Sequence, residues 1–221
     1  MSISALNEDL SRRVVILTDA EPWVPSPQPG VMRRPLDRHG AESGRATSLV
    51  RYEPGSSFPA HTHPEGEEFL VIEGVFQDES GVYPEGTYVL NPPGSRHAPS
   101  SPRGCVLFVK LCQYAGEGRA RLVLDTNRLE WRPGPAPGIM VKTLYRDPAH
   151  PETMMLMKFE PGASMPRHEH PGGEEFLVLE GALEDELGVY PRRTWVRNPR
   201  LSSHAPFSRE GAVIYLKAGG L

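Results

Sequence analysis

The sequence has only two cysteines and no long hydrophobic run. Cys105 and Cys112 lie seven residues apart in one predicted strand, and this odd spacing turns their side chains to opposite faces, away from a mutual disulfide. Two buried free thiols in a reducing compartment are expected, with the cytoplasm as the location. No apolar stretch approaches the roughly 20 residues that span a bilayer. Residues 1–11 also lack the basic and apolar regions of a secretory signal, so no membrane association is expected.

The sequence also lacks an excess of positive charge and has few long runs with helical periodicity. Its formal net charge is −4, which argues against the broad basic surface that nucleic-acid binding needs. Glycine and proline are abundant, at 22 and 24 residues, and they separate short apolar runs. This pattern predicts turns and strands, and hence an all-β protein.

One stretch of the sequence occurs twice. Residues 53–74 read EPGSSFPAHTHPEGEEFLVIEG, residues 160–181 read EPGASMPRHEHPGGEEFLVLEG, and 16 of the 22 positions are identical. The repeat extends to proline-rich segments at 23–32 and 131–140, which predict extended straps with a tryptophan packed against a sheet. A tandem duplication follows, with an N-terminal tail at 1–12, a first domain at 13–115 and a second at 116–221.

Each copy contains a His-x-His pair, a Glu-Glu pair and a later histidine. His97 and His204 each lie 34 residues after the second histidine of their pair. A single His-x-His is usually a solvated strand face, but the same set recurs in register in both halves. The candidate metal ligands are His61, His63, Glu67 and His97 in the first copy, and His168, His170, Glu174 and His204 in the second.

Strand parity favours the first glutamate of each pair as the ligand. Residues i and i+2 of a strand share a face, so both histidines of each pair point to one side. Glu67 lies four positions beyond His63 and would share that side in an extended chain, whereas Glu68 would not. A turn at 64–66 weakens the parity, and Glu68 and Glu175 are expected in contact with the ligands or at the rim.

Three imidazoles and one carboxylate suit a borderline divalent metal in each domain. Zinc, iron(II), manganese and nickel fit this donor set, whereas calcium and magnesium favour oxygen ligands. The second copy differs in the turn before its last histidine. Gly86, Pro93 and Gly94 of the first copy become Arg193, Arg200 and Leu201.

These residues resemble the two motifs of the cupin superfamily. Gly55-x5-His61-x-His63-x3-Glu67-x6-Gly74 matches the first motif, and Gly86-x5-Pro92-x-Gly94-x2-His97 matches the second except that Ser101 stands in place of an asparagine. The second half keeps the first motif and loses both glycines of the second. The sequence around the motifs is similar to that of the cupin-like domain of the ChrR anti-sigma factors.

The resemblance implies a bicupin, two double-stranded β-helix (jelly-roll) domains with a metal inside each barrel. The eight candidate ligands are the positions that match the family motifs. ChrR proteins carry an N-terminal helical zinc domain that grips the sigma factor. Here about a dozen residues precede the first strand, without a His/Cys cluster, so direct sigma-factor binding is not expected.

Two functions remain open at this point. The first is a zinc-binding regulatory or sensor module, with a small-molecule ligand in the barrel. The alternative is a non-haem metal-dependent dioxygenase that acts on a diketone or hydroxyketone, as in relatives with similar motifs. The absence of a further acid or base beside the ligands favours binding over catalysis, and a homodimer is expected by analogy with other bicupins.

Overall fold

The computed structural model describes residues 5–40, 44–114 and 116–221. Its regular structure is almost entirely antiparallel β-strand, as the sequence predicts, and η1 (Thr18–Ala20) is a single turn of 3-10 helix. Among the residues that the structure describes, no helix is long and apolar enough to cross a membrane. Contacts divide the chain into two compact units, one of residues up to Glu8 with Glu21–Arg128, the other of Asp9–Ala20 with Leu129–Leu221.

The first unit is a barrel built from strands of the first repeat and one strand of the second. Its strands are β1 (Ala5–Leu6), β3 (Val24–Pro25), β4 (Val31–His39), β5 (Ala46–Tyr52), β6 (Ser56–Ser57), β7 (His61–His63), β8 (Glu67–Asp78), β9 (Gly81–Pro84), β10 (Thr87–Asn91), β11 (Ser95–His97), β12 (Ser100–Ser101), β13 (Cys105–Leu111) and β14 (Leu122–Asp125).

The second unit repeats this arrangement. Its strands are β2 (Val14–Leu17), β15 (Arg132–Pro133), β16 (Ile139–Arg146), β17 (Thr153–Phe159), β18 (His168–His170), β19 (Glu174–Asp185), β20 (Gly188–Pro191), β21 (Thr194–Asn198), β22 (Ser202–His204) and β23 (Ala212–Ala218).

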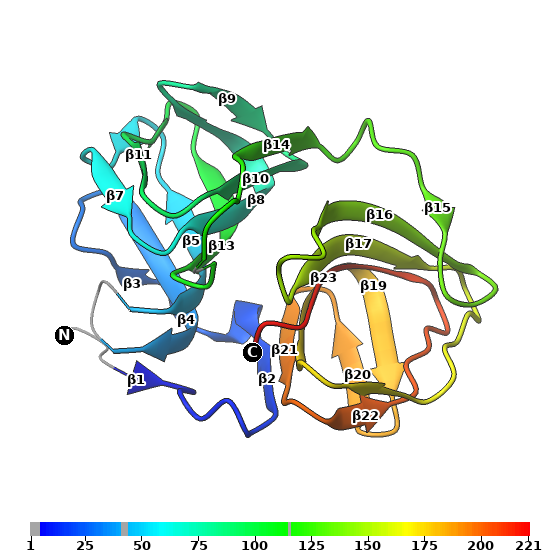
Figure 1. The fold of residues 1–221 in the computed structure, drawn as a ribbon. Helices are drawn as coiled ribbons and strands as arrows, with labels where there is room; N and C mark the ends of the chain where they lie inside the picture. The colour runs from blue at the N-terminus through cyan, green and yellow to red at the C-terminus, as the bar shows by residue number, and fades with distance from the viewer. Residues whose placement is uncertain (1–4, 41–43, 115) are drawn as a thin grey trace. The chain divides into compact units, whose positions relative to one another are not determined.

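The two units have equivalent sheets. The main sheet of the first has the order β1-β4-β5-β13-β8-β10-β14, and that of the second has the order β15-β16-β17-β23-β19-β21-β2. The histidines lie on a smaller face, where β7 pairs with β11 in the first unit (Figure 1) and β18 pairs with β22 in the second. This is the double-stranded β-helix that the family resemblance implies, and the expectation of a jelly roll is confirmed.

The edge strands differ from the expected domain boundaries. β2 pairs with β21 of the second unit, and β14 pairs with β10 of the first (Figure 1). Each repeat therefore gives its first strand to the barrel of the other repeat. Parts of the expected tail are also ordered, since β1 pairs with β4, while residues 1–4 lie outside the described residues. The hydrophobic periodicity of the sequence cannot reveal this exchange, because it predicts that a segment forms a strand but not which strand it pairs with.

One long strand in each unit joins the main sheet to the face that carries the histidines. β8 pairs with β13 and β10 along its first half and with β9 along its second, and its register against β13 shifts between Val106 and Leu107. Gly74 lies at this bend with φ 76°, and a Cβ atom there would meet the Gly104 carbonyl oxygen at 2.2 Å. Gly181 has the same role in β19, which explains physically why this motif position is glycine.

Apolar side chains line the interior of each barrel beside the histidines. The first core includes Phe69, Phe76, Tyr83 and Val89, and the second includes Phe176, Leu183, Tyr190 and Val196 at the equivalent positions. Both free thiols are present, but only Cys105 is buried. Cys112 is half-buried and follows β13 with φ 55°, so the expectation of two buried thiols within one strand is wrong for Cys112.

Candidate metal centres

Two adjacent strands and the start of a third bring the first set of predicted ligands together. His61 and His63 lie on β7, and His97 pairs with His61 across the β7–β11 ladder. The three rings have centroids 4.7 to 4.9 Å apart. Glu67 opens β8 after a turn in which Gly66 has φ 77°, and its side chain reaches the histidines. The turn at 64–66 thus keeps Glu67 on the histidine face.

The nitrogen atoms of the first centre converge on one point. The Nε2 atoms of His63 and His97 lie 3.0 Å apart, and Glu67 Oε2 lies 3.5 Å and 3.6 Å from them. His97 directs its Nδ1 toward the Asp78 carboxylate, which leaves its Nε2 as an acceptor that faces His63 Nε2. A divalent cation between these atoms would use both imidazole lone pairs and the carboxylate, so the residues fit a metal.

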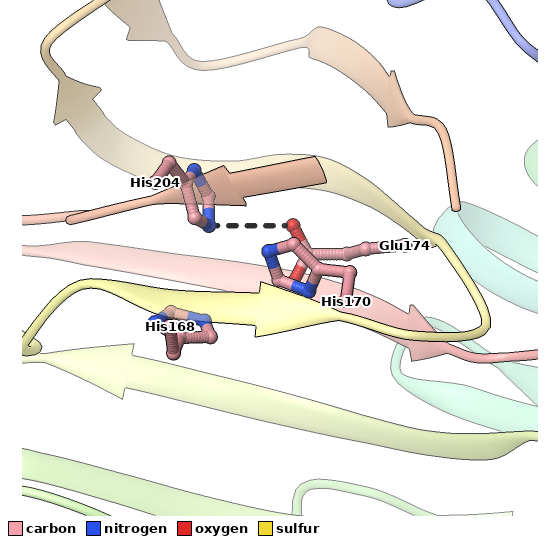
Figure 2. Close-up of side chains that lie close together, drawn as sticks. All are labelled: His168, His170, Glu174 and His204. Carbon is pink, nitrogen blue, oxygen red and sulfur yellow. Dashed lines mark ion pairs between the residues drawn. The ribbon is translucent and has the colours of Figure 1, made fainter. Parts of the chain in front are cut away.

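The second centre has the same composition, and its glutamate lies within the cluster of ligand atoms. Figure 2 shows His168 and His170 on β18, with Glu174 and His204 directed toward the same space. One ligand atom from each of the four side chains lies within 4.8 Å of the others, whereas in the first centre this holds for the three histidines. Glu174 lies 3.4 Å from His170 Nδ1 and 3.6 Å from His204 Nε2.

Burial holds two of these histidines in the neutral form that binds a metal. Desolvation lowers the pKa of His170 to about 4, with the two other imidazoles beside it acting in the same direction. Desolvation also lowers the pKa of His63, against the attraction of Glu67. His170 Nε2 is buried without a hydrogen-bond partner among the described residues. A buried nitrogen of this kind is costly unless a ligand or ion satisfies it, so the second centre also fits a metal.

Further side chains orient the ligands in both centres. His61 and His168 direct Nδ1 to the carbonyl oxygens of Pro59 and Pro166, at 2.8 Å and 3.0 Å, which leaves Nε2 for a metal. Asn91 donates a hydrogen bond to Glu67, and Asn198 donates one to Glu174. Sequence reasoning missed these asparagines, although both recur in register as the last residues of β10 and β21.

The second glutamate of each pair lies away from the metal centres. Glu68 is 2 % exposed and accepts a hydrogen bond from Tyr88, on the face of β8 opposite Glu67. Glu175 is 0 % exposed. The expectation that these residues contact the ligands or sit at the rim is wrong for Glu68. Strand alternation resumes at Glu67, so the Glu68 side chain lies on the other face of β8, where it is buried.

The altered turn of the second centre keeps the backbone of the first. Arg193 and Leu201 replace Gly86 and Gly94 and have φ values of 69° and 62°, close to those of the glycines. The Leu201 amide still donates to the His170 carbonyl, as the Gly94 amide does to that of His63. The second turn therefore presents His204 as the first presents His97, at the cost of two side chains in a left-handed conformation.

Replacing Leu201 by glycine should stabilise the second unit. A residue with a side chain loses roughly 1–2 kcal/mol of stability in a left-handed conformation. Glycine avoids this loss, but the greater entropy of its unfolded chain lowers stability by about 0.5–1 kcal/mol. Leu201 is 70 % exposed and loses little contact, so we expect a net gain of roughly 0.5 kcal/mol in the free energy of unfolding. Urea denaturation measures it. Gly94→Leu is the matched reverse variant and should destabilise the first unit. A loss of stability in Leu201→Gly would contradict the idea that the left-handed backbone of Leu201 is strained.

The two centres differ most in the space beside them. A cavity of about 450 Å³ opens next to the first centre, with Phe58, Phe76, Val50 and Val109 in its wall. The corresponding space in the second unit is about 30 Å³, which has room for about one water molecule. Met157 and Met165 stand there in place of Val50 and Phe58. Methionine fills irregular gaps because its chain is unbranched.

Solved structures with the same fold are similar to this chain over most of its length. A candidate dioxygenase from Nostoc punctiforme has a TM-score of 0.79 at 18% identity, covering 96% of this chain and 84% of its own. The protein Ylba from E. coli has a TM-score of 0.72 at 16% identity, with coverages of 98% and 94%. An oxalate decarboxylase from Bacillus subtilis has a TM-score of 0.63 at 13% identity, with coverages of 93% and 76%. At these identities the likeness shows the fold alone.

The sequence comparisons agree with the duplication. No curated protein matches the chain. The model of the ChrR cupin-like domain matches twice, at residues 11–115 and 119–221, which confirms the resemblance seen in the two histidine motifs. The chain therefore belongs to the ChrR cupin-like domain family, with one such domain in each half.

Proposed function

We propose that this bicupin binds a divalent metal in each barrel and uses the two centres differently. The first binds a small, mostly apolar ligand at its metal, and the second holds a metal that stabilises its barrel. The observation that carries this proposal is the unequal space beside two similar sets of ligands, about 450 Å³ against about 30 Å³. Ligand pockets in proteins have volumes of roughly 300–1,000 Å³, and the first cavity falls in that range.

Zinc is the metal we propose for the second centre. Structural zinc sites are closed by four protein ligands, and His168, His170, Glu174 and His204 supply four within a few ångströms. The pocket that adjoins these ligands, at about 30 Å³, is well below the roughly 300–1,000 Å³ of ligand pockets. Iron(II), manganese and nickel accept the same donors, so the fit of the residues narrows the choice of metal without fixing it.

At the first centre the metal would supply a Lewis acid that polarises an oxygen donor of the ligand. His61, His63, His97 and Glu67 would hold the ion at the wall of the cavity. The apolar side chains around it, Phe58, Phe76 and Val109 among them, would bind the carbon skeleton and exclude water. A ligand with one or two oxygens on an apolar body fits this wall.

A regulatory or sensor role agrees best with the side chains of the cavity. Tyr52 and Cys112 are in the wall, and burial raises the pKa of both. Both stay protonated near neutral pH, so neither serves as a base there. We therefore propose ligand binding as the main function. The second candidate is a dioxygenase, which the open cavity beside three histidines also favours, with a diketone or hydroxyketone as substrate.

The test uses cobalt(II)-loaded protein and acetylacetone, a small β-diketone, as the probe. Cobalt absorption bands report the ligands around each ion, and we expect the probe to change the bands of one of two cobalt equivalents. A response of both ions, or of neither, would contradict the unequal centres. Oxygen uptake by iron(II)-loaded protein with β-diketones and hydroxyacetophenones then separates the two functions, because turnover would replace the sensor role with the dioxygenase.

A further inference from the structure

In each barrel an arginine immediately precedes the exchanged edge strand. Arg121 precedes β14 in the first unit, and Arg13 precedes β2 in the second. The two residues are equivalent in the repeat, which reads Arg-Val-Val-Ile-Leu at 13–17 and Arg-Leu-Val-Leu-Asp at 121–125. By sequence, Arg121 belongs to the second repeat and Arg13 to the first. In the structure each arginine lies in the barrel of the other repeat.

In the first unit, Arg121 joins the two side chains that support the metal ligands. Its Nε donates to Asn91 Oδ1 at 3.1 Å, and Asn91 donates to Glu67 at 2.9 Å. Its Nη2 donates to the Tyr83 hydroxyl at 2.6 Å, and Tyr83 donates to Asp78 at 2.7 Å. The other oxygen of Asp78 lies 3.3 Å from His97 Nδ1. One guanidinium therefore connects to a carboxylate ligand on one side and to an imidazole ligand on the other.

The second unit contains the same connections. Arg13 donates to Asn198 Oδ1 at 2.9 Å and to the Tyr190 hydroxyl at 2.5 Å. Asn198 donates to Glu174, and Tyr190 donates to Asp185, whose second oxygen lies 3.0 Å from His204 Nδ1. The Asp185 side chain is 1 % exposed. Because six residue types and the five contacts between them recur in both barrels, the arrangement belongs to the site and is not an accident of one surface.

We propose that Arg121 and Arg13 are positioning residues that complete the metal centres, each supplied by the strand that one repeat gives to the barrel of the other. A planar guanidinium can hold two acceptors at a fixed separation, which a lysine ammonium cannot do. By holding the asparagine and the tyrosine together, it fixes the direction of the glutamate and the last histidine. Side chains that orient metal ligands in this way typically change metal affinity by about 10–100-fold.

The proposal rests on the metal binding proposed above and makes a crossed prediction in the full-length chain. Arg121→Ala should weaken the 61–97 centre by about 10–100-fold and leave the 168–204 centre unchanged, while Arg13→Ala should do the reverse. Arg121→Lys should recover only part of the affinity. Competition with a colorimetric zinc chelator measures each affinity, and cobalt(II) absorption bands show whether the ligand geometry of the affected centre changes.

Two further variants separate positioning from a general loosening of the barrel. Leu124→Ala weakens β14 without touching the arginine, and it should lower the melting temperature without changing the cobalt bands of the first centre. Tyr83→Phe keeps the ring and removes only the hydroxyl between Arg121 and Asp78, so it should change those bands. If wild-type protein binds no metal, the proposed function itself is wrong. If wild-type protein binds two ions and Arg121→Ala binds both with unchanged affinity, only the positioning role is overturned.

Discussion

Replacing His61 and His63 by alanine should remove one of two metal equivalents and abolish the response to acetylacetone. The double variant leaves Glu67 and His97, two donors where the intact centre has four, so the ion is lost. The apolar wall of the cavity is unchanged, but the ligand loses the ion that would bind its oxygen. Elemental analysis of purified protein measures the metal, and calorimetric titration measures the ligand.

The matched variant in the second barrel is His168→Ala with His170→Ala. It should also remove one equivalent, yet leave the acetylacetone response intact, because the space beside that centre is only about 30 Å³. A metal at 1,000 times its dissociation constant adds about 4 kcal/mol to stability, so both variants should melt earlier in the presence of zinc. Loss of the ligand response in the second variant would show that the centres are not divided as proposed.

The sequence was most informative where one local pattern determined the geometry. His61 and His63 are two residues apart in a strand, so their rings share a face whatever the rest of the barrel does. The recurrence of the set in both halves excluded coincidence. Parity also placed Glu67 correctly on the side of the histidines, since the turn with Gly66 restores the strand before Glu67.

The features that the sequence did not reveal depend on contacts between distant segments. The exchange of β2 and β14 requires knowing which edge each strand joins, and the same residues would form a strand in either barrel. Asp78 and Asp185 reach the last histidine only because β8 and β19 bend beyond Gly74 and Gly181. Their recurrence in register was the one available signal.

Cavity volume was also out of reach, because it depends on how many side chains pack together. Met157 replaces Val50 and Leu216 replaces Val109, which adds volume in the second barrel, yet Leu183 replaces Phe76 and removes some. The sum of such exchanges does not predict the space that remains. Only the packed structure separates a centre with a cavity from one without.

Filling the first cavity should abolish ligand binding while both metals stay bound. In the variant Val50→Phe with Val109→Phe, two phenyl rings occupy part of the 450 Å³ beside the first centre, where neither residue ligates the metal. Because the rings enter existing space, the strain should stay below the roughly 1–3 kcal/mol that overpacking a filled core costs. We expect acetylacetone affinity to fall at least about tenfold, or 1.4 kcal/mol, with the zinc content unchanged.

Val82→Phe is the control, since Val82 is 64 % exposed and lies outside the cavity. It adds the same ring to the surface and should leave acetylacetone affinity as in the wild type. If the cavity variant binds the probe as tightly as the wild type does, the ligand does not occupy this space. The difference in cavity volume would then not explain a difference in function between the two centres. If it loses zinc as well, the rings have disturbed β7 or β8, and the histidines and the cavity wall form one packing unit that cannot be altered separately.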